Sequence, residues 1–576
     1  MSFGRTAWRL LTLLRPLRGL WGVAVLGLAS IVLNVTGPLL LGRATDLVVT
    51  GALTRPEQGI DGRALAATLL GAAGVYAGSA AFWILQRRFI TRLVQRAVFH
   101  LRREVAEKLG RLPVPYFDRQ PRGEVLSRTT NDVDNLAQSL QQCLGQITNT
   151  AFLLAGTLGM MFWISPLLAV VALVTVPVSV LLTRVAGRRA QAEHALQWQA
   201  TGELNAHVEE AYTGHTVITA YGRRRESAAA FRDHNARLCR SSARAQFVSG
   251  VIGPATGLAG NLGYVLVAVA GGFQLAAGAL TVGAVQAFIQ YSREFGGPLT
   301  ALAGLAGVIQ SGVASGARVL ELLDEPEEPA DPPGAAAPVR GRVVFDEVSF
   351  AYGEAAPVIR DLSLVVEPGT TVAVVGPTGA GKTTLVNLLM RFYDVTAGRI
   401  TVDGVDLRDM SRDALRAATG MVPQDNWLFH GTIRDNIAYG RAGATAAEVE
   451  AAARAAHADH FVRTLSRGYD TVIDQDGGAL SAGERQLITI ARAILADPVI
   501  LVLDEATSSV DSRTELLIQR ALTRARRDRT CFVIAHRLST IRQADVILML
   551  DDGAVAERGT HEELLAAGGP YAALHA

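Results

Sequence analysis

The chain has 576 residues, too many for one hydrophobic core, so the sequence predicts at least two domains. Charged residues make up 19%, below the roughly 25% typical of soluble proteins, and 49% of residues are hydrophobic, which indicates a part embedded in a membrane. The net charge of +2 argues against a nucleic-acid-binding protein, because such proteins concentrate basic residues on one face.

Uncharged stretches in the first 325 residues are long enough to cross a bilayer, which takes about 20 apolar residues. Stretches 19–42 and 64–86 can each span once, whereas 135–183 and 245–292 can each hold two spans joined by a tight turn. We therefore predict a transmembrane domain over 1–325, with no charged residue in the central part of any span. Its six spans are expected near 19–42, 64–86, 140–163, 165–183, 247–271 and 280–300.

Basic residues indicate which side of the membrane the connecting segments occupy. Segments 87–128 and 184–244 carry eleven and ten Lys or Arg residues, and such segments stay in the cytoplasm. Because a seventh span over the uncharged run 295–317 would place the remaining chain outside, we expect six. The protein is then a multi-pass protein of the cytoplasmic membrane, with its N-terminus and its C-terminal domain in the cytoplasm.

The same two basic segments are too long for ordinary loops. Apolar residues recur at helical spacing from Ile90 to Leu109. The spans are therefore expected to continue as helices into the cytoplasm and to turn back near 113–115 and 213–215. The first residues of the chain are expected to form either a helix on the membrane surface or an extension of the first span.

Residues 326–339 are acidic and rich in proline, which predicts a semi-rigid linker. Beyond it, over 340–576, short apolar runs alternate with helical patterns, as in α/β domains. Runs 372–375 and 499–503 have the composition of central parallel strands that are buried on both faces. The expected fold class is multi-domain, an all-α six-helix transmembrane domain with long cytoplasmic helical extensions followed by an α/β domain.

A glycine-rich loop lies between the first of these strands and a helical stretch, which is the context that a phosphate-binding loop requires. Its glycines let backbone N–H groups close around phosphates, and the helix N-terminus adds positive potential. Lys382 can reach the outer phosphates, and the Thr383 hydroxyl can bind Mg²⁺. This motif makes the α/β domain a P-loop NTPase, with ATP and Mg²⁺ as expected cofactors. The predicted ATP-binding residues of the loop are Gly376, Pro377, Thr378, Gly379, Ala380, Gly381, Lys382, Thr383 and Thr384.

Two acidic residues, Asp504 and Glu505, follow the strand predicted at 499–503. Asp504 would lie beside the Mg²⁺. Glu505 would orient or deprotonate the attacking water, because phosphoryl transfer depends chiefly on positioning and charge. Acidic residues are common at strand ends, so this pair indicates a catalytic site only in combination with the phosphate-binding loop upstream.

A third segment, 480–486, begins a helix with Ser481 in the N-cap position. Together with the loop and the acidic pair, this segment resembles the signature motif of ATP-binding cassette (ABC) proteins. With six helices before it, the whole chain resembles an ABC exporter half-transporter of the multidrug and lipid type, the type IV exporters. Further positions that match the family are Tyr352, Gln424, Asp511 and His536.

The resemblance implies a role for each of these residues. Tyr352 would stack on adenine, and Gln424 would sense the γ-phosphate. His536 would hydrogen-bond the γ-phosphate and act in catalysis with Glu505 and Lys382. The implied Mg²⁺ ligands are Thr383, Gln424 and Asp504.

The resemblance also implies that the signature segment contacts the nucleotide of the opposite subunit, so that two composite ATP sites form at a dimer interface. Asp511 would belong to the D-loop between these sites. Two short helices, near 116–120 and 211–217, would transmit closure of the sites to the transmembrane domain. The implied signature residues are Ser481, Ala482, Gly483 and Glu484.

At two signature positions the chain departs from the family, which usually has glycine in place of Ala482 and glutamine in place of Glu484. Segment 474–478 also differs from that of homodimeric exporters. These departures beside an intact Glu505 resemble the catalytic-glutamate subunit of heterodimeric bacterial exporters. A heterodimer with a second ABC half-transporter is therefore the expected assembly, with a homodimer as the open alternative.

The function implied by the resemblance is ATP-driven export by alternating access. Apolar spans with scattered uncharged polar groups suit amphipathic drugs or lipids, so the expected partners are such a substrate and the lipid bilayer, with no nucleic acid. An ATP-binding membrane regulator or receptor without net transport is the main alternative, and an importer is a further one.

Overall fold

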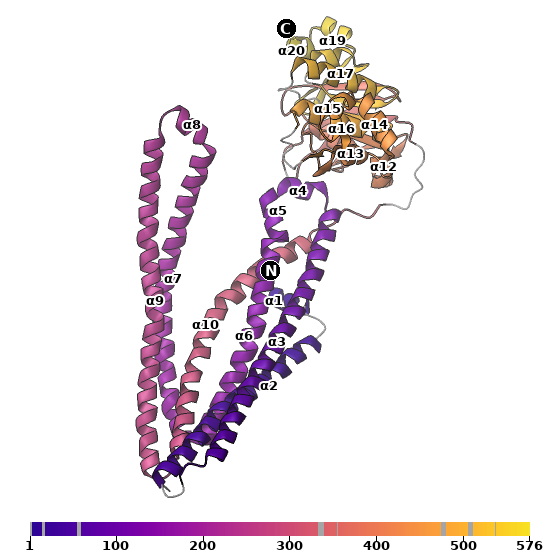
Figure 1. The fold of residues 1–576 in the computed structure, drawn as a ribbon. Coiled ribbons are helices and arrows are strands. Elements are labelled where there is room, and N and C mark those ends of the chain that lie inside the picture. The colour runs from indigo at the N-terminus through magenta and orange to yellow at the C-terminus, as the bar shows by residue number, and fades with distance from the viewer. Residues whose placement is uncertain are drawn as a thin grey trace. The chain divides into compact units, whose positions relative to one another are not determined.

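The computed structural model divides the chain into two compact units (Figure 1). The helical unit comprises Met1–Gly110 and Arg122–Glu325, and the α/β unit comprises Arg111–Pro121 and Pro326–Ala576. The described residues are 3–13, 18–54, 59–331, 339–353, 355–473, 480–504, 511–535 and 537–575.

Long helices make up the helical unit, and several exceed the thickness of a bilayer. Helix α3 has 50 residues and α9 has 53. At 1.5 Å per residue these helices are about 75–80 Å long, so they continue well beyond the predicted spans. The helices are α1 Phe3–Leu13, α2 Arg18–Val49, the π-helical turn η1 Thr50–Thr54, α3 Gly62–Arg111, α5 Arg122–Thr129, α6 Asn131–Ile164, α7 Pro166–Thr213, α8 His215–Ala220, α9 Arg224–Ala276 and α10 Val282–Asp324.

Several helical stretches among the described residues are long and apolar enough to cross a membrane. The four stretches that meet this criterion are Gly19–Ala52, Gly62–Arg111, Arg122–Ile164 and Arg224–Ala276. The same part of the chain contains six long helices, which are α2, α3, α6, α7, α9 and α10. The bounds of the six spans stay a prediction.

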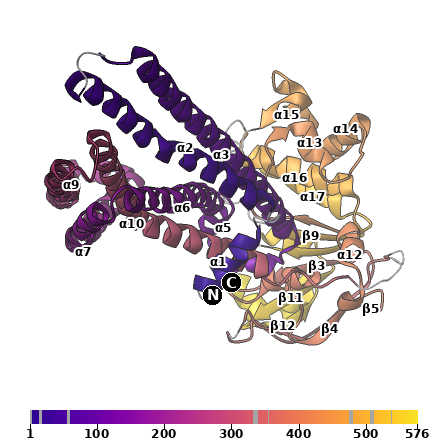
Figure 2. The same cartoon turned by 90° about the horizontal axis from the view of Figure 1, so that it is seen from below.

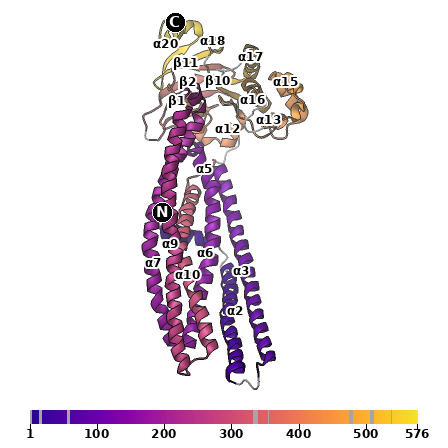
Figure 3. The ribbon, with the colours of Figure 1, turned by 60° about the vertical axis from the view of Figure 1, so that its left-hand side comes forward.

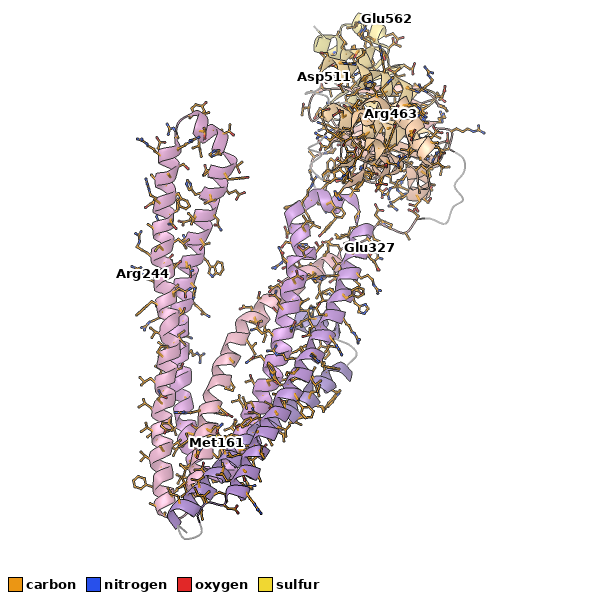
Figure 4. The ribbon with its side chains drawn as sticks, in the orientation of Figure 1. Met161, Arg244, Glu327, Arg463, Asp511 and Glu562 are labelled. Atoms are coloured by element: carbon orange, nitrogen blue, oxygen red, sulfur yellow. The ribbon has the colours of Figure 1, made fainter. Side chains whose placement is uncertain are left out.

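The turns between the helices fall close to the positions expected from the sequence. Helix α6 ends at Ile164, and Ser165 caps α7 by accepting a hydrogen bond from the N–H of Leu168 at 3.3 Å. Only Gly214 separates α7 from α8, within the turn expected at 213–215. Basic side chains such as Arg244 on α9 lie on the long helices that leave these turns (Figure 4).

One end of the helical unit gathers three connections, and we call it the turn end (bottom of Figure 3). The Ser165 hydroxyl, between α6 and α7, donates to Gln274 near the end of α9 at 3.0 Å. Asp46, near the end of α2, accepts hydrogen bonds from the Thr281 hydroxyl and from the N–H of Gly283 at the start of α10, both at 2.7 Å. These bonds connect the start of α7 with α9, and α2 with the start of α10.

Helices α2 and α10 touch at the turn end through two glycines, Gly42 and Gly283. A Cβ atom on Gly42 would collide with the carbonyl group of Gly283, and a Cβ atom on Gly283 would collide with that of Gly42. The two backbones therefore meet directly, with no side chain between them. We call this contact the glycine seam.

Helix α1 packs on α10, and residues 14–17, which connect it to α2, lie outside the described residues. Arg9 forms an ion pair with Asp324 at 2.6 Å. Leu10 is buried, and its side chain fills the space beside Gly316 of α10.

The α/β unit contains a six-stranded and a four-stranded sheet. The six-stranded sheet has the order β12-β11-β3-β10-β9-β6, the four-stranded sheet has the order β2-β1-β4-β5, and β7 pairs with β8. The strands are β1 Val343–Phe350, β2 Ile359–Val366, β3 Thr371–Val375, β4 Ala397–Val402, β5 Val405–Asp406, β6 Thr419–Val422, β7 Gly431–Thr432, β8 Val472–Ile473, β9 Ile500–Asp504, β10 Thr530–Ile534, β11 Val546–Asp551 and β12 Ala554–Gly559.

The six-stranded sheet is buried on both faces. Every residue of β3, β9 and β10 is buried, as their continuous apolar composition indicates. Helices α13 to α17 cover one face, and α11 with the four-stranded sheet covers the other (Figure 2). The helices of this unit are α4 Val114–Arg119, α11 Lys382–Leu389, α12 Arg412–Ala418, α13 Ile433–Ala438, α14 Ala446–Ala455, α15 Asp459–Thr464, α16 Ala482–Ala496, α17 Ser512–Arg526, α18 Leu538–Arg542, α19 His561–Ala567 and α20 Pro570–His575, with short 3₁₀ turns η2 Leu407–Asp409 and η3 Gly468–Asp470.

Candidate functional site

Three parallel strands bring predicted site residues to one edge of the six-stranded sheet. Strand β10 pairs with β3 on one side and with β9 on the other, and the register aligns Ile534 with both Val374 and Asp504. Because the carboxyl ends of parallel strands meet at the same edge, the loop after β3 and Asp504 share this edge. Glu505 and His536 follow β9 and β10 closely in the chain but lie outside the described residues.

The loop after β3 is compact because its glycines adopt conformations that other residues rarely take. Gly376 has φ of 152°, and a Cβ atom there would collide with the carbonyl oxygen of Leu550 in β11. Gly381 has φ of 95° directly before α11, and a Cβ atom there would lie 2.7 Å from a methyl carbon of Ile359. Glycine tolerates both features at little cost, which explains why the sequence places it at these positions.

Lys382 is the first residue of α11, and its side chain folds back over the loop. Its Nζ donates hydrogen bonds to the carbonyl oxygens of Gly376 at 2.7 Å and Pro377 at 2.9 Å. Burial lowers the pKa of Lys382, and the negative charge of Asp504 opposes this shift. A cation held against the loop is placed to meet a phosphate that the loop encloses.

The predicted Mg²⁺ ligands present one carboxylate, one hydroxyl and one amide. Asp504 is buried at the end of β9, whereas Thr383 and Gln424 are exposed. Strand β6 aligns Val422 with Leu503 of β9, so Gln424, two residues beyond β6, follows the same sheet edge. No group of three or more His, Cys, Asp or Glu residues forms a metal site among the described residues. The donor set fits Mg²⁺ bound with a nucleotide, because this ion takes one or two carboxylates together with substrate phosphates.

Tyr352 lies in an aromatic cluster directly after β1. Its ring meets the rings of Phe350 and Tyr393 edge to face, with centroid distances of 4.9 and 5.0 Å. Its hydroxyl lies 3.1 Å from the Thr384 hydroxyl in α11. The side chain is 38% exposed beside the phosphate-binding loop, which suits a residue that stacks on a base.

The signature segment begins α16 with a capping box. The Ser481 hydroxyl accepts a hydrogen bond from the N–H of Glu484 at 3.3 Å. The Glu484 carboxylate in turn accepts bonds from the N–H of Ser481 at 2.7 Å and from its hydroxyl at 2.8 Å. The carboxylate therefore points back to the helix N-terminus and takes both Ser481 donors. The family resemblance assigns Ser481 to contact with the partner's nucleotide, and in this structure both of its donors bond to Glu484 instead.

Asp511 is the N-cap of α17 and lies on the surface of the α/β unit (Figure 4). Its carboxylate accepts hydrogen bonds from the N–H groups of Arg513 at 3.1 Å and Thr514 at 3.0 Å. The pKa of Asp511 is lowered, chiefly by its hydrogen bonds from Thr514. Asp511, which the resemblance assigns to the D-loop, therefore caps α17 in the described structure.

The segment that connects α3 to α5 belongs to the α/β unit. The Tyr393 hydroxyl donates to Asp118 of α4. Arg111, at the end of α3, pairs with Glu327 at 2.9 Å, and its carbonyl oxygen accepts from the N–H of Glu328 at 3.0 Å. Short helices lie close to both expected tip positions, α4 in the α/β unit and α8 in the helical unit.

Helix α10 carries two charged residues, although the span predicted within it was expected to have no central charge. Arg293 and Glu294 lie 11 and 12 residues after Val282, about 17–18 Å from the turn end. Both residues fall within the predicted span 280–300, so the expectation that no span carries a central charge conflicts with the bounds predicted for that span. An unpaired charge at the centre of a span costs roughly 2.5–3.5 kcal/mol.

The two charged side chains have different surroundings. The guanidinium carbon of Arg293 lies 4.8 Å from the ring centroid of Tyr264 on α9. Glu294 places Oε1 3.4 Å from Nε2 of Gln290, which also lies 3.4 Å from the hydroxyl of Tyr76 on α3. The other Glu294 oxygen is buried without a hydrogen-bond partner among the described residues.

Comparison with known proteins agrees with this arrangement. The family model for the ABC transporter transmembrane region matches residues 20–299, and the ABC transporter model matches residues 359–508. The "Fatty acid ABC transporter ATP-binding/permease protein" of Mycobacterium tuberculosis is 50% identical over 604 residues, which cover 99% of this chain and 96% of that protein. The "ATP-dependent lipid A-core flippase" of Thiobacillus denitrificans is 35% identical over 571 residues, which cover 99% and 97%.

A solved structure, "Structure of a bacterial Atm1-family ABC exporter with ATP bound", aligns with a TM-score of 0.75 and 32% identity over 97% of this chain and 98% of that one. The predicted fold class, a helical transmembrane domain followed by an ABC ATPase domain, is thereby confirmed. The chain belongs to the ABC transporters, as a multi-pass half-transporter of the type IV exporter group that couples ATP hydrolysis to transport.

Proposed function

We propose that this protein exports lipid-like amphipathic molecules across the cytoplasmic membrane by alternating access. The observation that carries the substrate class is the 50% identity, over 99% of the chain, to a transporter named for fatty acids. A lipid flippase is a second full-length relative. The long apolar helices of the helical unit suit a substrate with a long hydrocarbon part.

In the proposed ATP site, the loop N–H groups and Lys382 bind the phosphates while Tyr352 stacks on adenine. The contacts of Lys382 with the Gly376 and Pro377 carbonyl groups support this role, because they hold its ammonium group at the mouth of the loop. Thr383, Gln424 and Asp504 would hold Mg²⁺, which when bound neutralises charge on the β- and γ-phosphate oxygens.

In the same proposal, Glu505 orients the attacking water and accepts its proton, and His536 hydrogen-bonds the γ-phosphate. The register of β9 and β10 supports the proposal that both residues act at one sheet edge. Asp504, directly before Glu505, is aligned with Ile534, which lies two residues before His536. Phosphoryl transfer gains its rate mainly from such positioning and from charge stabilisation.

We propose that the assembly is a heterodimer with a second ABC half-transporter, placed with the ATPase domains in the cytoplasm. Compared with glycine, Ala482 adds one methyl group where a partner's nucleotide would bind. The Glu484 carboxylate accepts hydrogen bonds from the N–H and hydroxyl of Ser481, which are then not available to that nucleotide. In such a heterodimer, the site that contains Glu505 would be completed by the partner's signature segment, and it would be the more active of two unequal sites.

The test uses the protein co-purified with its native partner and reconstituted in lipid nanodiscs and vesicles. Glu505→Gln should lower the ATPase rate at least about 100-fold and leave ATP binding intact, because the change removes a base without removing a phosphate contact. Glu562→Gln, at an exposed acid of α19, is the matched control and should leave the rate unchanged.

Each of three results would contradict a separate part of the proposal. An unchanged rate in Glu505→Gln would refute the catalytic assignment. A single band with full activity on purification would refute the heterodimer. ATP hydrolysis without movement of fatty acids or phospholipids between the leaflets of vesicles would refute lipid export and favour a regulator.

A further inference from the structure

We propose that Arg293, which lies over the ring of Tyr264, binds the anionic headgroup of the transported amphiphile, a carboxylate or a phosphate. This inference rests on the proposed function, because it names the headgroup chemistry of the same substrate. The site lies on α9 and α10 of the helical unit, well away in the chain from the ATP-binding residues.

Arg293 and Tyr264 lie at the same depth in the helical unit. Arg293 is 11 residues after the start of α10, and Tyr264 is 12 residues before the end of α9 at Ala276. Both helices meet at the turn end, so each residue is about 17–18 Å from it. A hydrocarbon core of about 30 Å places the pair close to the bilayer centre.

The geometry prepares the guanidinium group for an anion. The Tyr264 ring centroid lies 4.8 Å from the guanidinium carbon of Arg293, a cation–π contact. A cation–π contact does not use the guanidinium N–H groups as hydrogen-bond donors, so these remain available for a bidentate contact with a carboxylate or phosphate. The contact also limits the motion of the side chain, so less freedom is lost when the anion binds.

The charge of Arg293 has no acidic counterpart among the described residues. The side chain is exposed in the single chain, and the ion pairs of the described residues do not include it. Glu294 does not neutralise it, because consecutive helix positions point about 100° apart and the Glu294 carboxylate lies beside Gln290. An exposed arginine at this depth is unfavourable against lipid tails, so it is expected to face a polar cavity or a ligand.

Space for a hydrocarbon chain adjoins this arginine. Gly260 and Gly257 lie one and two turns before Tyr264 on the same face of α9. No atom lies within 4 Å of a Cβ placed on either glycine. A headgroup on Arg293 would therefore have room beside α9 for the attached chain.

The experiment measures equilibrium binding of palmitate, lysophosphatidate and hexadecanol to the purified dimer in nanodiscs. Arg293→Gln should weaken binding of at least one of the two anions by at least about tenfold, the loss expected for a charge-assisted hydrogen-bonded pair, and should leave hexadecanol binding within about twofold. The anion that weakens identifies the headgroup. Arg87→Gln is the matched control, since Arg87 also lies over an aromatic ring, that of Trp83 at 5.4 Å, but 25 residues into α3 and beyond the hydrocarbon depth.

The possible outcomes separate this inference from the proposed function. Unchanged binding of both anions in Arg293→Gln, with normal binding by the wild type, overturns the inference and leaves lipid export standing. Failure of the wild type to bind any of the three amphiphiles overturns the proposed substrate class and the inference with it. If Arg293→Gln loses hexadecanol as well, Arg293→Lys decides, because it keeps the charge. Retained anion binding in that variant supports the inference, and its loss refutes it.

Discussion

The hydroxyl of Tyr393 donates a hydrogen bond to the carboxylate of Asp118 across 2.6 Å, although 275 residues separate the two in the chain. Asp118 lies in α4, which connects α3 to α5. Tyr393 also contacts the ring of Tyr352, the residue proposed to stack on adenine, at 5.0 Å. The Tyr393 side chain therefore contacts both Tyr352 and the helix between α3 and α5.

Removing this hydroxyl should uncouple ATP hydrolysis from transport. Tyr393→Phe keeps the aromatic contacts and deletes the donor, so we expect the basal ATPase rate and the affinity for ATP to stay within about twofold. Substrate-stimulated ATPase and lipid transport should fall severalfold, because a lost hydrogen bond to a charged group is worth about 1.5–3 kcal/mol. Tyr439→Phe, at an exposed tyrosine of the same unit, should change neither quantity.

The same bond should not depend on pH in the physiological range. Burial and the neighbouring Asp118 carboxylate raise the pKa of Tyr393 well above its ordinary value, so the hydroxyl keeps its proton between pH 6 and 9. The ratio of stimulated to basal ATPase should fall equally at both pH values in Tyr393→Phe. Asp118→Asn should cause a similar loss, and the double variant should be no worse than either single one. Additive losses would show that the two residues act separately.

Replacing Glu484 by glutamine should strengthen ATP-driven closure of the dimer. The change keeps a capping-box residue but removes a negative charge from beside Ser481, so a partner's phosphates meet less repulsion. Glu448→Gln is a close control, because Glu448 forms the same capping box with Thr445 at the start of α14. Both variants should keep a melting temperature close to that of the wild type, because glutamine can also serve in a capping box. Only Glu484→Gln should trap nucleotide at lower ATP concentration, and equal trapping in both would refute the argument.

The glycine seam should tolerate no side chain. Gly283→Ala would force α2 and α10 apart at the turn end, because the new methyl group would meet the Gly42 backbone and the Asp46 side chain. We expect the melting temperature of the purified dimer to fall by several degrees, an overpacking cost of about 1–3 kcal/mol. Gly304→Ala lies on the same helix with open space around its Cβ, so the higher helix propensity of alanine should keep or raise the melting temperature. Similar behaviour of the two variants would contradict a tight seam.

Much of the fold could be predicted from local sequence patterns. The phosphate-binding loop, the N-cap at Ser481 and the strand before Asp504 each depend on neighbours within a few residues, and spacing reveals such features directly. The turn at Ser165 could be found for the same reason, since it interrupts two apolar runs. Strand register then brings the loop and Asp504 to one sheet edge, as the parallel topology requires.

Contacts between distant segments could not be predicted in this way. Nothing local to Tyr393 indicates that its hydroxyl meets Asp118, and the direction of the Glu484 carboxylate depends on a side-chain rotation. The uncharged run ends at Ser292, but the span predicted over 280–300 extends past it, so Arg293 lies within a span that was expected to carry no central charge. Depth in a membrane depends on where a helix begins and ends, which composition locates only roughly.

Helix α3 makes a small movement at one end large at the other. Its last residue, Arg111, is held by Glu327 and Glu328, and α4 follows directly after it. The helix has 50 residues and is about 75 Å long, so a tilt of about 5° at Arg111 displaces the opposite end by about 6–7 Å. That displacement exceeds the spacing of one helical turn. A small change in the direction of α3 at Arg111 would therefore move the side chains at its other end past those of a neighbouring helix by about one turn.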